Sequence, residues 1–369
     1  MSKSIKHLSL SIATGIALGF SWPVNGLTFL IFISLIPLLY LEESIRKDNL
    51  KFKSIRVFGY SYLSFLIWNL ITTWWLFNST LFGMLFANLC NSLFYALIFV
   101  VFYWAKSRLP FKSAYIFLIS AWIAFEKLHL FWDFSWSWLN LGNVFSEKIY
   151  WIQWYEYTGT FGGTLWILCI NVWIFYLLKN EDFKSLKNII RKLIPPLITI
   201  ALPIVFSLYL YQKVEIKDKT IEVLMMQPNI DPYKSKYKLT NEYFLNQLFD
   251  QLRPYLTKNT KYVLTPETYF AEGYGEELLS FYKSKIHNDI QKKIADFPNT
   301  QIISGIQFYD TYVQKNAPSL TANFIRKNLW VEYYNSAFSE QYQKDIDVYH
   351  KSKLVVGVEN MPFKKILKP

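Results

Sequence analysis

The chain has 369 residues, of which 52% are hydrophobic and 19% aromatic. Its mean hydropathy is positive, at +0.15, which argues against a purely soluble protein. The formal charge of +12 does not indicate nucleic-acid binding, because most of the excess lies among the apolar runs. Residues 1–212 carry 17 lysines and arginines against 9 acidic residues, whereas residues 213–369 carry 22 against 18. Basic residues between apolar runs are typical of membrane proteins.

Seven apolar runs of the length that crosses a bilayer occur in the first part of the chain. The first run lacks a small-residue cleavage site and another run follows almost at once, so we expect a retained helix and not a signal peptide. The sequence therefore predicts a polytopic α-helical membrane bundle over residues 1–212. The expected spans lie near residues 8–22, 26–41, 57–77, 80–104, 111–126, 161–178 and 193–212.

Lysine and arginine alternate between the loops that join these runs. They are frequent before the first run and in the second, fourth and sixth loops. The first and third loops have none, and the long fifth loop has only Lys127 and Lys148. Because cytoplasmic loops carry an excess of these residues, we expect a cytoplasmic N-terminus. Everything after residue 212 is then on the opposite side of the membrane.

The fifth loop, near residues 127–160, is poor in charge and rich in tryptophan and tyrosine. Such residues favour the membrane–water boundary, so we expect the loop to lie along the interface. It is either an aromatic anchor or the lining of a groove through which lipids enter. Glu126 precedes the loop at the end of an apolar run. A carboxylate at membrane depth indicates function, but pairing with Lys127 or His129 at a helix end is equally consistent.

Residues 213–369 have the pattern of an ordinary soluble domain. Short runs rich in β-branched and aromatic residues alternate with two segments whose apolar residues recur at helical spacing. This order predicts a layered α/β domain. The expected strands are 221–230, 261–268, 300–310, 329–340 and 347–355, and the expected helices are 241–256 and 276–297.

The cysteines and histidines carry no metal or disulfide pattern. Cys90 and Cys169 lie inside apolar runs, where small buried thiols are expected and a disulfide framework is not. The four histidines have no ligand spacing, so we predict no metal site. They are His7, His129, His287 and His350.

Several short motifs occur in the order of a known family. The stretch AWIAFEKLHLFWDFSWSWLNLG, with Glu126 and Trp136, resembles a W…E…FPW…G region. Three motifs follow in the second part of the chain: Thr265-Pro266-Glu267, Tyr334-Asn335-Ser336, and Tyr349 to Glu359 with Lys351 between them. Together these motifs resemble the apolipoprotein N-acyltransferases, membrane-bound members of the nitrilase (carbon–nitrogen hydrolase) superfamily.

The resemblance implies a fold, a reaction and a location. It implies that an αββα nitrilase-like sandwich follows the membrane bundle, in the periplasm, at a bacterial inner membrane. It implies transfer of a phospholipid acyl chain, through a cysteine thioester, to the α-amino group of a diacylglyceryl-modified N-terminal cysteine on an apolipoprotein. Both partners are lipid-anchored, and neither a cofactor nor nucleic acid is implied.

The resemblance also implies residue roles. Glu267 would be the general base, Lys351 the stabiliser of the oxyanion, and Glu359 a supporting acid. Four residues would contribute to substrate binding: Tyr237, Trp136, Asn335 and Glu126. The sequence departs from the family pattern in three places: Thr265 and Tyr237 each replace a tryptophan, and Val356-Gly357-Val358 replaces Pro-Phe-Gly.

The nucleophile of this family is a cysteine that follows the lysine by some tens of residues. No cysteine follows Lys351 here, and Cys90 and Cys169 lie in apolar runs. We therefore expect residues 213–369 to be a nitrilase-like domain that lacks its C-terminal part, and the chain as given to be inactive. Two alternatives remain open: a membrane-tethered amidase of the nitrilase superfamily, and a non-catalytic remnant that binds lipid.

Overall fold

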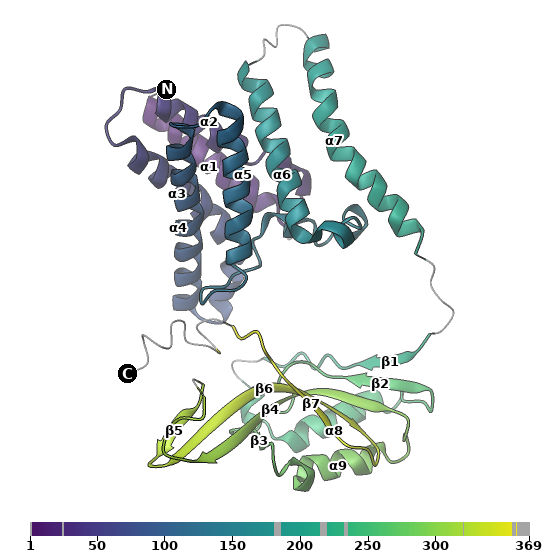
Figure 1. The fold of residues 1–369 in the computed structure, drawn as a ribbon. Coiled ribbons are helices and arrows are strands. Elements are labelled where there is room, and N and C mark those ends of the chain that lie inside the picture. The colour runs from purple at the N-terminus through teal and green to yellow at the C-terminus, as the bar shows by residue number, and fades with distance from the viewer. Residues whose placement is uncertain are drawn as a thin grey trace. The chain divides into compact units, whose positions relative to one another are not determined.

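The computed structural model describes residues 2–23, 26–180, 186–214, 220–231, 235–319, 321–355 and 359. They form two compact units, a helical unit 1 (Met1–Glu215) and an α/β unit 2 (Ile216–Pro369), drawn in Figure 1.

Unit 1 is built from α-helices joined by short 3-10 turns (Figure 1). Each apolar run that the sequence predicts as a span lies largely within a helix, and the second run covers η2 (Thr28–Phe32) and α2. The helices are α1 (Lys3–Ser21), α2 (Ile36–Lys47), α3 (Lys53–Thr73), α4 (Leu81–Lys106), α5 (Phe111–Leu128), α6 (Tyr155–Asn180) and α7 (Leu186–Gln212).

Among the described residues, four helical segments are long and apolar enough to cross a membrane. They are Thr28–Lys47, Leu81–Lys106, Tyr155–Asn180 and Ile190–Gln212. The remaining predicted spans lie in α1, α3 and α5, which carry more polar residues.

Small polar residues in α1 and α3 allow the two helices to pack closely. Ser11 Oγ donates to Tyr60 O at 2.7 Å, and Ser64 Oγ donates to Ser11 O at 3.0 Å. A Cβ atom on Gly15 would meet Ser64 O and the side chain of Ile67, so glycine is required there. The serines lower the hydropathy of each helix, but the hydrogen bonds that they form between the helices stabilise the association of α1 with α3.

A buried ion-pair network joins three helix termini of unit 1. Glu42 and Glu43 lie near the end of α2, where Lys106 of α4 places Nζ 2.5 Å from Glu42 Oε2 and 2.9 Å from Glu43 Oε2. Arg46 pairs with Glu42 and Lys179 of α6 pairs with Glu43. These basic helix ends therefore meet at one end of the unit.

Unit 2 contains a mixed sheet in the order β1-β2-β4-β6-β5, with β3 paired to β4 and β7 paired to β6. Neighbours β1, β2 and β4 are parallel, whereas β6 runs antiparallel to β4, β5 and β7. The strands are β1 (Glu222–Met225), β2 (Thr260–Leu264), β3 (Glu276–Glu277), β4 (Gln301–Val313), β5 (Asn323–Arg326), β6 (Leu329–Gln341) and β7 (Asp347–His350).

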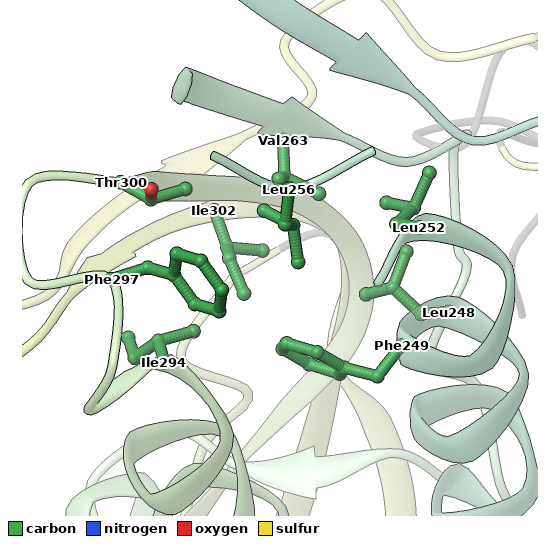
Figure 2. A pocket seen from close by; sticks show the side chains of 9 residues that line it. All are labelled: Leu248, Phe249, Leu252, Leu256, Val263, Ile294, Phe297, Thr300 and Ile302. Atoms are coloured by element: carbon green, nitrogen blue, oxygen red, sulfur yellow. The ribbon is translucent and has the colours of Figure 1, made fainter. Parts of the chain in front are cut away.

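Two amphipathic helices, α8 (Asn241–Leu252) and α9 (Lys285–Ile294), lie along the sheet and share its core (Figure 1). Leu248 of α8 and Ile290 of α9 are buried with Ile302 of β4. Figure 2 shows the apolar gap where these elements meet, whose volume of about 10 Å³ holds one water molecule at most. The core on this side is therefore closed, and a substrate has no room in it.

Each expected strand and the first expected helix are present, but β1, β2, β7 and α8 end earlier than predicted. The helix predicted over 276–297 is wrong in its first part. Glu276 and Glu277 pair with β4 as β3, and the helix begins only at Lys285. Ser284 determines that start, because its Oγ accepts a hydrogen bond from His287 N at 3.2 Å. Strand β5 was not predicted, since all its residues are exposed and show no alternation.

Candidate functional site

Three charged residues that the motifs single out meet at the end of the sheet. Lys351 follows β7, and its Nζ lies 2.9 Å from Glu267 Oε1 and 2.9 Å from Glu359 Oε2. Glu359 lies 8 positions from Lys351 in sequence, but Glu267 lies 84 positions away. The fold and not local spacing therefore brings Glu267 to Lys351. We call these three residues the charged cluster.

Glu267 is carried by a tight turn that crosses β4 after β2 ends. Thr265 N donates to Ile303 O at 3.1 Å before the turn, and Phe270 N donates to Gly305 O at 3.0 Å after it. Gly305 lies directly beneath, where a Cβ atom would overlap the backbone of the turn. The close approach explains the glycine and fixes the position of Glu267.

Asn335 of β6 joins the two carboxylates of the charged cluster. Its Nδ2 donates to Glu267 Oε1 and, at 2.9 Å, to Glu359 Oε1. Its carbonyl accepts from Lys351 N at 2.8 Å, which extends the pairing of β6 with β7. The amide of Val355 donates to Glu359 Oε2 at 2.7 Å. Asn335, expected to bind substrate, therefore also orients both carboxylates.

Lys351 determines the charge states in the cluster. Its hydrogen bond lowers the pKa of Glu267 below the ordinary 4.5, and the bond from Asn335 adds to this. Burial alone would raise the pKa of Glu359, but the bonds from Val355 N and Lys351 outweigh it, so this pKa is also lowered. Burial opposes the charge on Lys351, yet the two carboxylates raise its pKa above 10.5. All three groups are therefore ionised at neutral pH.

The charged cluster borders a pocket of about 300 Å³. The side chain of Glu267 is 61% exposed and that of Lys351 is 27% exposed, so a ligand can reach both. Pockets of this size are typical of small-molecule sites. The lining residues come from β4, β6 and β7 and from the segments that follow β2 and β7: Thr265, Glu267, Ile303, Ser304, Gly305, Asn335, Ser336, Ala337, Tyr349 and Lys351.

Tyr237 lies in the 3-10 turn η6 (Lys236–Lys238) and is exposed. Its neighbour Lys236 donates from Nζ to Glu267 O at 3.1 Å and to Thr268 Oγ1 at 2.5 Å. Sequence reasoning missed Lys236, and its position just before Tyr237 was the only available signal. The structure thus connects the segment that carries Tyr237 to the turn that carries Glu267.

Glu126 lies in unit 1 and is fully buried at the end of α5. Its Oε1 accepts from Trp122 Nε1 at 3.1 Å and from Leu141 N at 2.8 Å, and its Oε2 accepts from Thr164 Oγ1 at 2.7 Å. The expected alternative of pairing with Lys127 or His129 is wrong: Lys127 Nζ lies over the rings of Phe131 and Phe161, and His129 bonds to Asn91 and Trp132. Glu126 therefore joins α5, α6 and the fifth loop, near residues 127–160, which we call the aromatic loop.

Trp136 also lies in unit 1, half-buried within the aromatic loop. Its backbone amide donates to His129 O at 2.9 Å, and its ring centroid lies 5.0 Å from that of Trp138. The ring of Trp138 in turn stacks on Trp75 at 4.8 Å. The loop is thus an ordered aromatic surface and not an extended linker.

The sequence has two cysteines, and neither lines the pocket. Cys90 lies in α4 and Cys169 lies in α6. Among the described residues, no group of three histidine, cysteine, aspartate or glutamate side chains is arranged to hold a metal ion. The chemistry available at the pocket itself is that of carboxylates, an ammonium group, amide donors and the hydroxyl groups of Thr265, Ser304, Ser336 and Tyr349.

Comparison with known proteins agrees with the motifs. The family model of the apolipoprotein N-acyltransferase N-terminal domain matches residues 14–173. The curated apolipoprotein N-acyltransferase of Chlorobaculum tepidum is 26% identical over 373 aligned residues, which cover 97% of this chain. The chain spans 66% of the length of that relative. The resemblance inferred from the motifs is confirmed: the chain is similar to the apolipoprotein N-acyltransferases, and residues 14–173 match the model of their N-terminal domain.

Proposed function

We propose that this protein takes part in the N-acylation of lipoproteins, with the pocket beside the charged cluster as the acyl-transfer site. The acyl donor is a phospholipid, and the acceptor is the α-amino group of a diacylglyceryl-modified N-terminal cysteine. The observation that carries the proposal is Lys351, whose ammonium group lies between the carboxylates of Glu267 and Glu359 at the edge of an open pocket. The similarity to a named N-acyltransferase supports it.

The roles follow from the charges. Ionised Glu267 accepts the proton of a thiol, and the thiolate attacks the ester carbonyl of the phospholipid. Lys351 stabilises the oxyanion that forms. The C–O bond then breaks, the lysophospholipid oxygen takes the proton from Glu267, and a thioester remains. The α-amino group then attacks the thioester, the C–S bond breaks and the amide forms, while Glu267 passes the proton lost by the amine to the departing thiolate. Glu359 and Asn335 hold Lys351 and Glu267 in place.

The pocket in unit 2 has no cysteine among its lining residues, and Cys90 and Cys169 both lie in helices of unit 1. A general base must approach the thiol to about 3 Å. We propose that neither cysteine serves the Glu267–Lys351 site, and that residues 1–369 form no thioester there. A hydroxylamine-labile acyl adduct on the unsubstituted chain that disappears with Glu267→Gln would contradict this.

The proposed membrane arrangement has seven spans and a cytoplasmic N-terminus in a bacterial inner membrane, with unit 2 in the periplasm. The meeting of Lys106 and Lys179 at the Glu42–Glu43 network supports it, because basic helix ends then gather on one side. The tryptophans of the aromatic loop belong to the opposite helix ends. We propose that Trp136 and the loop held by Glu126 contact lipid, and that Tyr237 contacts the acyl chain.

The proposed chemistry is tested by placing a thiol in the pocket. Ala337 lines the pocket two residues from Asn335 on the same strand, so alternation directs both side chains to the same face. The chain with Ala337→Cys, Cys90→Ala and Cys169→Ala is purified into vesicles that contain phospholipid radiolabelled in its acyl chains. We expect a hydroxylamine-labile acyl adduct on the protein.

Substitutions in the charged cluster decide whether the adduct reflects catalysis. Glu267→Gln and Lys351→Met should each slow formation of the adduct more than tenfold, which corresponds to a barrier higher by about 1.4 kcal/mol or more. Lys238→Met, which replaces an exposed lysine of η6, is the matched control and should leave the rate unchanged. Absence of an adduct, or equal rates with and without Glu267, would contradict the proposed function.

A further inference from the structure

One lysine connects the segment before α8 to the turn that carries Glu267. The Nζ atom of Lys236 lies 3.1 Å from Glu267 O and 2.5 Å from Thr268 Oγ1. The side chain is half-buried, unlike that of Lys238 in the same 3-10 turn, which is exposed. Hydrogen bonds from a charged donor are among the strong ones, and partial burial strengthens them further.

The turn that Lys236 contacts has an unfavourable backbone. Thr268 has φ 48°, in the left-handed region that β-branched residues avoid. The side chain of Glu267 is 61% exposed, so few packing contacts hold it. A turn of this kind keeps its conformation only when neighbouring groups fix it. Gly305 fixes the turn from below, and Lys236 bonds to its carbonyl and hydroxyl groups.

The other end of the same segment has its own connection. Asn241 N donates to Glu272 Oε2 at 2.6 Å, and Asn241 Nδ2 donates to Glu276 Oε1 at 2.8 Å. These bonds fix the start of α8 independently of Lys236. The contribution of Lys236 is therefore local to η6 and the Glu267 turn.

We infer that Lys236 is a positioning residue, which holds the Glu267 turn and the Tyr237-bearing η6 in one fixed arrangement beside the pocket. The meaning of this arrangement for catalysis rests on the proposed function, in which Glu267 is the base and Tyr237 contacts the acyl chain. The connection itself does not depend on that function, and it can be measured without any activity.

Hydrogen–deuterium exchange of the full chain in detergent measures the connection. The amides of Lys238 and Phe270, bonded to Ser235 O and Gly305 O, report on η6 and on the turn. In Lys236→Met we expect about tenfold faster exchange in peptides covering 235–240 and 265–271, because the two hydrogen bonds from the charged lysine that join these segments are lost. Peptides from β4 and β6 should not change.

Two further variants separate positioning from general loss of stability. Lys236→Arg keeps a charged donor that can reach both oxygens, so it should restore slow exchange in both peptides. Lys238→Met should leave them unchanged. In the Ala337→Cys background, Lys236→Met should slow acyl-adduct formation about tenfold, and Lys236→Arg should restore most of it.

The inference is overturned if Lys236→Met leaves both peptides unchanged, if Lys236→Arg behaves like Lys236→Met, or if exchange rises equally across all of unit 2. If no variant forms an adduct, including the one with the intact charged cluster, the proposed function fails. The exchange results still decide the role of Lys236 in that case.

Discussion

The chemistry of the pocket depends on a single lysine between two carboxylates. Without Lys351, Glu267 and Glu359 would repel each other across Asn335, whose amide donates to both. With Lys351 present, each carboxylate has a cation within 3.0 Å and stays ionised. The arrangement thus keeps a carboxylate beside a cation, and the proposed reaction uses the first for proton transfer and the second for oxyanion stabilisation.

The lowered carboxylate pKa values predict how pH affects stability. Glu359 contributes stability that is present above its ordinary pKa of 4.5 and is lost as pH falls through its lowered value. Lys351 contributes stability that is present below 10.5 and is lost as pH rises through its raised value. We expect Glu359→Gln to destabilise unit 2 by about 1–3 kcal/mol near pH 7, and the difference to shrink below pH 4.5.

Thermal unfolding of both proteins across the pH range measures this difference. Glu242→Gln is the matched control, because Glu242 forms an ion pair of 2.5 Å with Lys285 in which both side chains are exposed. Exposed pairs contribute little, so its effect should be near zero at every pH. Equal effects of the two substitutions would show that Glu359 is an ordinary surface charge.

Among the elements, the aromatic loop of unit 1 is positioned by one buried carboxylate. Glu126→Ala would leave the donors of Trp122, Leu141 and Thr164 without their acceptor. Each buried unsatisfied group costs about 1–3 kcal/mol, so we expect a loss of about 3 kcal/mol or more. The loss should appear as a lower unfolding temperature in detergent and as faster proteolysis within residues 130–150.

Glu156→Gln is the control for Glu126, because Glu156 lies in the first turn of α6 and is exposed. It should change neither the unfolding temperature nor the proteolysis rate. If Glu126→Ala behaves in the same way, the hydrogen bonds of Glu126 do not hold the loop.

The long strands and the amphipathic helix α8 of unit 2 were predictable because their apolar residues recur with the period of a strand or of a helix. Strands β4 and β6 and helix α8 bury regular sets of apolar residues. The start of the region 276–297 was not predictable. Glu276 and Glu277 form a strand by backbone pairing with β4, and their side chains carry no apolar pattern that indicates it. Strand β5 has no buried face, so the sequence gives no signal there.

The candidate site was predictable only in part, for the same kind of reason. The motifs identify Glu267, Lys351 and Glu359, and the fold brings them together. The bonds of Asn335 to both carboxylates depend on the register of β6 against β7, which no local pattern encodes. The contacts of Lys236 depend on a turn in which Thr268 has a positive φ.

At the scale of the whole molecule, a helical unit with apolar spans and an α/β unit with a polar pocket belong to one chain. Such a pairing suits the proposed reaction, in which donor and acceptor are both lipid-anchored. The proposed topology predicts that alkaline phosphatase fused after Thr300 is active, since that enzyme folds only outside the cytoplasm, and that the same fusion after Lys51 is inactive. Fusions of β-galactosidase should show the opposite pattern, and activity of β-galactosidase after Thr300 would contradict the topology.

The central claim is that Lys351 stabilises negative charge at the reacting atom in the pocket while Glu267 accepts a proton there. The pH dependence of iodoacetamide alkylation tests it most directly, in the chain with Ala337→Cys, Cys90→Ala and Cys169→Ala. We predict that Lys351→Met raises the pH of half-maximal alkylation by about one unit or more, since a cation is removed from beside the thiolate. Glu267→Gln should lower it, because a neighbouring negative charge is lost. Alkylation curves that coincide for all three proteins would contradict the account.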